Sequence, residues 1–101
     1  MGTYNIKYSW RFNLELDNII YYIDNILMNP IASNNLINLY LKKCSNLQMF
    51  PYSFSPLKPQ YCSKRYFKIK NYLFIYSINE KSKTVYLERC LYSKTNLKEK
   101  K

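Results

Sequence analysis

The stretch YLFIYSI at residues 72–78 decides the fold, because seven residues of which six are apolar, between polar turns, are typical of a central strand. Residues 79–83 (NEKSK) form a polar turn after it, and residues 84–91 have the composition of the next strand. Residues 65–69 read as the preceding strand, which turns through residues 70–71. Three antiparallel strands that form one sheet are therefore predicted in the second half of the chain.

The first half of the chain has a helical period after a short strand at residues 3–9 (TYNIKYS). From Trp10 onward, apolar residues recur every three or four positions and predict an amphipathic helix of about 18 residues. The stripe consists of Phe12, Leu16, Ile19, Ile20, Ile23, Ile26 and Leu27. Asn29-Pro30 ends this helix and can begin the next one, with Asn29 as its N-cap.

The second helix carries an apolar stripe of Leu36, Ile37, Tyr40, Leu41, Cys44 and Leu47, and Phe50-Pro51 ends it. Two helices joined by so short a link are expected to pack as an antiparallel hairpin. A loop of about twelve residues, rich in proline and serine, follows. The prediction is an α+β domain: an N-terminal strand, the helix hairpin on one face of a sheet, and three antiparallel strands. Residues 1–95 form this single domain and residues 96–101 a basic tail.

The charge of the chain is strongly basic and unevenly placed. Sixteen Lys and Arg residues stand against six Asp and Glu residues, which gives a net charge of +10. Residues 1–57 carry four basic and three acidic residues, whereas residues 58–101 carry twelve basic and three acidic ones. A basic half of this kind favours a polyanionic partner, either nucleic acid or an acidic protein segment, over a basic surface that only keeps the chain in solution.

Composition excludes several kinds of chemistry. The chain has no histidine, which removes an imidazole base and histidine metal ligands, and its single glycine excludes phosphate-cradling loops. Its three cysteines, Cys44, Cys62 and Cys90, fit neither a disulfide framework nor a metal knuckle, so we expect free thiols. No metal or other cofactor is expected. No apolar run is long enough for a membrane span and no signal peptide is recognisable, so we expect a cytoplasmic protein without a membrane partner.

The order of these features resembles the RelE/ParE superfamily of type II toxin–antitoxin toxins. The opening strand, the Asn29-Pro30 break with Ala32, and the sequence L-x-x-F-P at residues 47–51 are similar to that family. Arg65, residues 71–76 and residues 84–92 resemble the remaining strands of its core. The resemblance implies a toxin neutralised by a cognate antitoxin, with ribosome-bound mRNA or DNA gyrase as target. Operator DNA would be bound only through the antitoxin.

The resemblance also implies candidate site residues. Lys68 and Lys70 are similar to the paired lysines of the members that cleave mRNA without a metal, and strand alternation places Tyr66, Lys68 and Lys70 on one face. Arg89, Tyr92 and Lys94 lie at or beyond the end of the last strand and could clamp phosphate, stack or donate a proton. The candidate catalytic residues are Lys68, Lys70, Arg89 and Tyr92, and the candidate binding residues are Lys64, Arg65 and Lys94.

Each candidate also has a structural interpretation. Alternating lysines on an exposed strand commonly prevent edge-to-edge aggregation. Arg65 shares its strand face with Phe67 and Ile69, which fits a structural ion pair, and Arg89 alternates with Val85, Leu87 and Leu91 on an expected core face.

Two departures from the ribonuclease pattern weaken that chemistry. Leu73 stands where those members carry a phosphate-binding arginine, and Tyr92 and Lys94 stand where many have histidine and arginine. A gyrase inhibitor needs no acid–base set. A non-toxic module that acts only with its antitoxin on operator DNA is the remaining alternative.

Overall fold

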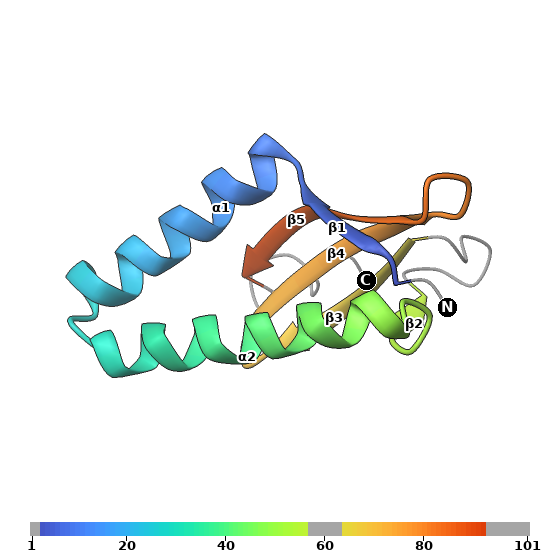
Figure 1. Ribbon diagram of the computed structural model, residues 1–101. Coiled ribbons are helices and arrows are strands. Elements are labelled where there is room, and N and C mark those ends of the chain that lie inside the picture. The colour runs from blue at the N-terminus through green and yellow to red at the C-terminus, as the bar shows by residue number, and fades with distance from the viewer. Residues whose placement is uncertain (1–2, 57–63, 93–101) are drawn as a thin grey trace, which may run out of the picture.

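In a computed structural model that describes residues 3–56 and 64–92, two helices lie on a five-stranded sheet (Figure 1). The elements are β1 (Asn5–Tyr8), α1 (Trp10–Tyr21), η1 (Tyr22–Ile26), α2 (Pro30–Met49), β2 (Ser55–Pro56), β3 (Lys64–Ile69), β4 (Tyr72–Asn79) and β5 (Thr84–Tyr92). Neither helix of the described residues combines the length and hydropathy that crossing a membrane requires.

The sheet has the strand order β1-β5-β4-β3-β2. Strands β3, β4 and β5 pair antiparallel as predicted, and β1 pairs parallel with β5, with Asn5 opposite Thr84 and Tyr8 opposite Leu87. A short strand, β2, adds to β3 inside the segment that was expected to be loop only. The α+β prediction is confirmed, and the parallel β1 joins the two ends of the chain in one sheet.

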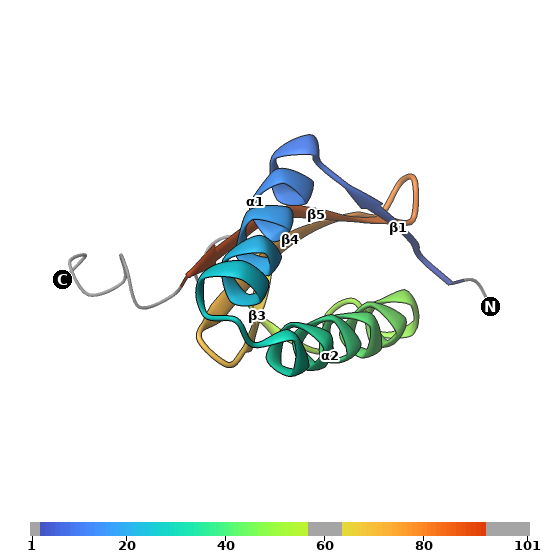
Figure 2. The same cartoon turned by 90° about the vertical axis from the view of Figure 1, so that its left-hand side faces the viewer.

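Each helix of the hairpin begins at a capping residue, and Asn29 is the N-cap that the sequence predicts for the second one. The Ser9 hydroxyl accepts a hydrogen bond from the Phe12 N–H at 2.9 Å, and the Asn29 side chain accepts one from the Ala32 N–H at 3.2 Å. The first helix ends differently from the prediction, because η1 is a π-helical turn in which the Leu27 N–H bonds to the Tyr22 carbonyl at 3.0 Å. The two helices are joined at this end and diverge away from it (Figures 1 and 2).

The core is an aromatic cluster between the helices and one face of the sheet. Phe74 of β4 is fully buried, and its ring lies 6.1 Å from Phe12, 5.6 Å from Tyr40 and 5.0 Å from Phe67 between centroids. The Tyr76 hydroxyl, also buried here, donates to the Pro51 carbonyl at 2.7 Å, so its polar end is satisfied. The two predicted helix stripes supply the other wall of this core.

Three residues of the predicted helix stripes are more than half exposed. Ile26, Leu27 and Leu41 are 59%, 54% and 54% exposed. Ile26 and Leu27 lie where the two helices are joined. The predicted place of Cys44 on the apolar face of the second helix is confirmed. Cys44 and Cys90 are both buried, free thiols, and burial raises the pKa of Cys90 to about 12.

Candidate functional site

The sheet face opposite the helices, called here the open face, carries candidate cations. Strand alternation places Lys64, Tyr66 and Lys68 of β3 on this face, because Phe67 and Ile69 between them are buried in the core. The register aligns Lys68 with Leu73 of β4, and Leu73 in turn with Leu91 of β5. The open face therefore combines basic, aromatic and aliphatic side chains.

Lys64 is tied to a carboxylate on this face. Its ammonium group lies 2.6 Å from a Glu88 oxygen, and the Ser77 hydroxyl donates to the other oxygen at 2.7 Å. Glu88 of β5 thus pairs with Lys64 of β3 and accepts a hydrogen bond from Ser77 of β4, which lies between them in the sheet. Lys64 contributes to the cohesion of the sheet through Glu88, and its charge is partly compensated.

Lys68 and Lys70 do not form the pair expected from strand alternation. Strand β3 ends at Ile69, and Lys70 lies in the two-residue turn with a left-handed backbone, φ 57°. The expectation of a common strand face for both lysines was wrong for Lys70, because the alternation stops where the chain turns. Lys68 is exposed, and no hydrogen bond or ion pair holds it within residues 3–56 and 64–92.

Arg89 has left the expected core face because the ladder between β4 and β5 is irregular. Ile75 pairs with Arg89 while Tyr76 pairs with Leu87, so Glu88 is an extra residue on β5. Such a β-bulge reverses the alternation of all later residues. Cys90 takes the buried position instead of Arg89, which corrects the expectation that Arg89 shares a face with Val85 and Leu87.

A carboxylate on α1 binds Arg89 at the free edge of β5. The Glu15 oxygens lie 2.7, 3.0 and 3.2 Å from guanidinium nitrogens, and one of them also accepts the Cys90 N–H at 2.8 Å. This hydrogen bonding with Glu15 raises the pKa of Arg89. Beyond Leu87, where β1 no longer pairs with β5, Glu15 thus binds the strand edge and its arginine together.

Tyr92 lies on the sheet face opposite to Lys68. The register pairs Tyr92 of β5 with Tyr72 of β4, and Tyr72 in turn with the buried Ile69 of β3. The two tyrosine rings are 5.5 Å apart between centroids. Both line a pocket of about 550 Å³ with Ile19, Tyr22 and Leu27 from the first helix and its end. The candidate acid Tyr92 and the candidate base Lys68 are therefore separated by the sheet.

Arg65 of β3 contacts the segment that follows α2. Its guanidinium donates to the Phe54 carbonyl at 2.6 Å and lies 5.0 Å from the centre of the Tyr52 ring. These contacts attach the segment after α2 to β3, next to the short strand β2. The last candidate, Lys94, lies outside the described residues, as do Cys62 and residues 96–101.

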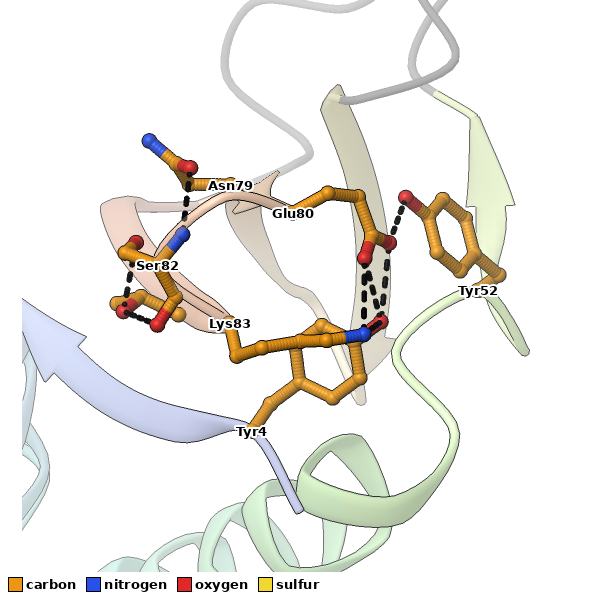
Figure 3. A network of polar contacts seen from close by, with 7 residues as sticks. Tyr4, Tyr52, Asn79, Glu80, Ser82 and Lys83 are labelled. Carbon is orange, nitrogen blue, oxygen red and sulfur yellow. Dashed lines mark hydrogen bonds and ion pairs between the residues drawn. The ribbon is translucent and has the colours of Figure 1, made fainter. Parts of the chain in front are cut away.

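A polar network that the sequence did not indicate lies at the end of the sheet where β4 turns into β5 (Figure 3). The Glu80 carboxylate accepts hydrogen bonds from the Tyr4 hydroxyl at 2.9 Å and the Tyr52 hydroxyl at 2.5 Å, and Lys83 approaches it at 3.3 Å. The Tyr52 bond lowers the pKa of Glu80, and that carboxylate raises the pKa of Tyr52 to about 12. These residues are up to 79 positions apart, so no local pattern could have revealed the network.

Comparison with known proteins gives a match in structure and none in sequence. No protein-family model and no curated protein matches the chain. The fold is similar to a chain of the toxin–antitoxin complex RelBE2 from Mycobacterium tuberculosis, with TM-score 0.61 and 15% identity over 91% of this chain and 93% of that chain. It is also similar to a chain of the chromosomal ParDE toxin–antitoxin system of P. aeruginosa, with TM-score 0.65 and 14% identity over 89% and 96%.

This chain has the RelE/ParE fold. The resemblance noted from the sequence is thereby confirmed at the level of the fold, over nearly the whole length of both neighbours. Within this RelE/ParE fold, the described residues contain no cluster of His, Cys, Asp and Glu that could hold a metal ion. What the open face offers chemically is point charge and hydrogen bonding from Lys68 and Tyr66, flanked by Leu73, which is only 7% exposed.

Proposed function

We propose that the chain is the toxin component of a type II toxin–antitoxin system and inhibits growth until a cognate antitoxin neutralises it. The observation that carries this proposal is the fold match, which spans at least 89% of this chain and at least 93% of two chains from toxin–antitoxin systems. The basic second half supports it, because twelve basic residues suit an acidic partner segment or a target associated with nucleic acid. Both partners would place the chain in the cytoplasm.

We further propose that inhibition does not depend on cleavage of mRNA. Metal-free cleavage of RNA needs a base, an acid and a phosphate clamp around one phosphate group. Here Tyr92 and Lys68 lie on opposite faces, and Glu15 engages Arg89 in three short contacts. Leu73 occupies the position of the expected clamp. Because these groups do not surround one phosphate, we favour a protein target such as DNA gyrase, which the chain would bind without catalysing a reaction.

The antitoxin segment that fits this chain is acidic with apolar anchors. Four of the six acidic residues are already bound within the fold: Glu15 by Arg89, Asp24 by Ser33, Glu80 by two tyrosines and Glu88 by Lys64. Lys68 and Lys70 are exposed, so the unpaired charge is positive. We propose that the segment covers part of the open face or the groove of the helix hairpin, and that added salt weakens its rim contacts.

Expression in a bacterial host, with and without the neighbouring reading frame, tests these proposals. We expect growth arrest from the chain alone, relief by the neighbour, blocked gyrase supercoiling or accumulated cleaved DNA, and intact mRNA at the ribosomal A site. Absence of arrest by a folded chain would favour the non-toxic module that acts with its antitoxin on operator DNA. Cutting of mRNA in the A site would make the chain a ribonuclease.

Two lysine variants test whether growth arrest depends on a lysine that acts as a base in mRNA cleavage. Lys68→Ala removes the exposed cation of the open face, and Lys42→Ala removes an exposed cation of α2 as the matched control. If no lysine acts as base, both variants should arrest growth to a similar extent. A ribonuclease that uses Lys68 would lose roughly 10²-fold or more in cutting rate in the first variant only.

A further inference from the structure

The junction of the two helices exposes an apolar surface, called here the hairpin tip. It consists of Tyr22, Ile26, Leu27, Met28 and Ile31, whose exposed fractions are 48%, 59%, 54%, 77% and 72%. These side chains present on the order of 500 Å² of surface, which is near the upper end of the largest apolar patch on a typical monomer. Patches of that size commonly bind another molecule.

The backbone of the hairpin tip has two unusual features. Tyr22–Ile26 form a π-helical turn, a rare conformation that occurs frequently at functional sites. Met28 follows with φ 52° in the left-handed region, which is unfavourable for a residue with a long side chain and is more easily adopted by glycine or asparagine. Met28, the most exposed of the large apolar residues that the structure describes, is thus held in a conformation that its side chain disfavours, which points to use of that side chain.

The charge around the hairpin tip separates it from the rest of the chain. Residues 12–41 contain no lysine or arginine, although the whole chain has sixteen. Of the three acidic residues in this range, Glu15 binds Arg89 and Asp24 accepts a hydrogen bond from the Ser33 hydroxyl. The exposed apolar residues at the other end of α2 differ, since Arg65 stacks on the ring of Tyr52 there. An acidic antitoxin segment therefore suits other surfaces better than this one.

We propose that the hairpin tip pairs with the hairpin tip of a second copy of this chain about a two-fold axis. In such a contact the same patch meets itself, so an uncharged apolar patch is self-complementary. The hairpin tip is also remote from the β4–β5 turn and the N-terminal residues, as Figure 1 shows. Residues 12–41 contain no lysine or arginine, so the hairpin tip itself brings no positive charge into the contact.

The adjoining pocket and the size of the hairpin tip indicate how the two copies would pack and how tightly they would bind. The pocket of about 550 Å³ begins at Tyr22 and Leu27 and continues to Tyr72 and Tyr92, so side chains of the second copy can insert beside the hairpin tip. The contact would bury on the order of 1,000 Å² in total, the lower limit of specific interfaces. The dimer should therefore be weak and reversible. It goes beyond the proposed function and does not depend on it.

Sedimentation of the purified full chain over a range of concentrations tests the proposal. We expect a reversible increase from 12.3 kDa to twice that mass, without larger species. The variant Met28→Asn/Ile31→Gln should weaken dimerisation at least about tenfold and keep its thermal midpoint, because asparagine accepts the left-handed backbone. Trp10→Gln, at the far end of α1 with 74% exposure, is the matched control and should dimerise normally.

Salt and the antitoxin distinguish this contact from its alternatives. Added salt should strengthen the dimer, because it screens the repulsion between two basic copies and leaves apolar contact intact. A chain that stays monomeric at every concentration and salt level would overturn the proposal, as would an open series of larger species. Loss of antitoxin binding in the double variant, with no change in self-association, would assign the hairpin tip to the antitoxin instead. Growth arrest is measured separately, so neither result decides the proposed toxin function.

Discussion

The two faces of the sheet are built from the same three strands but depend on different interactions. On the helix side, Phe67, Phe74 and Tyr76 are at most 3% exposed; the ring of Phe67 contacts the other two, and the ring of Phe74 contacts aromatic rings of both helices. On the open face, cohesion comes from polar contacts such as Lys64 with Glu88. Apolar burial adds up over an area, whereas a surface ion pair in water contributes little. Loss of a side chain should therefore have very different consequences on the two faces.

The largest effect is expected at the centre of the helix-side face. Phe74→Ala should lower the free energy of unfolding by about 3–5 kcal/mol, because it removes a fully buried ring and leaves a cavity. Ile75→Ala, the next residue on the same strand but on the partly exposed open face, should cost clearly less. Urea unfolding measures both. Equal losses would contradict the contrast between the faces.

The next effect concerns Glu15, which joins α1 to the free edge of β5. Glu15→Ala should destabilise the chain by about 1–3 kcal/mol, because the Cys90 N–H and the Arg89 guanidinium both lose their acceptor. Asp17→Ala is the matched control, since this exposed carboxylate lies two residues along the same helix; its effect should stay within about 0.5 kcal/mol. Thermal unfolding of the two variants measures both losses. An unchanged stability in Glu15→Ala would contradict the proposed role of Glu15 at the edge of β5.

A smaller effect separates the lysines of the open face. The coupling energy between Lys64 and Glu88, measured by a double-mutant cycle with Lys64→Ala and Glu88→Gln, should be about 0.2–1 kcal/mol and shrink with salt. Lys68→Ala should change stability by less than about 0.5 kcal/mol, because this residue is exposed and has no partner among the described side chains. A larger loss from Lys68→Ala would reveal a structural role for it.

The smallest effect is a change in pH dependence from the network around Glu80. The pKa of Tyr52 is raised to about 12 from 10.0, so its stabilising contribution is complete below pH 10 and disappears as the pH rises from 10 to 12. The pKa of Glu80 is lowered from 4.5, so its contribution is present above pH 4.5 and disappears at lower pH. Tyr52→Phe should flatten both limbs of the stability profile, whereas Tyr86→Phe, on the exposed side of β5, should not. Identical profiles for the two variants would show that the network does not contribute in solution.

Local sequence was sufficient for the two helices, for the strands other than β2 and for most of the core. Asn29-Pro30 gave the helix break, because proline both ends a helix and begins one, and the apolar run at 72–78 gave the central strand. The candidate site was less predictable. Lys68 and Tyr66 lie on the open face as expected, but Lys70 belongs to the turn and Tyr92 to the opposite face. Roles of single side chains depend on neighbours that alternation alone does not specify.

The sequence by itself determined the helix hairpin, the antiparallel strands and the basic second half, because period, proline and charge act over a few neighbouring residues. The tertiary structure decided the parallel pairing of β1 with β5, the extra residue Glu88 and the network around Glu80. Each of these joins residues far apart in the chain. One inserted residue in a strand reverses the face of every residue after it, and this is why the position of Arg89 became known only from its cross-strand partner and from Glu15.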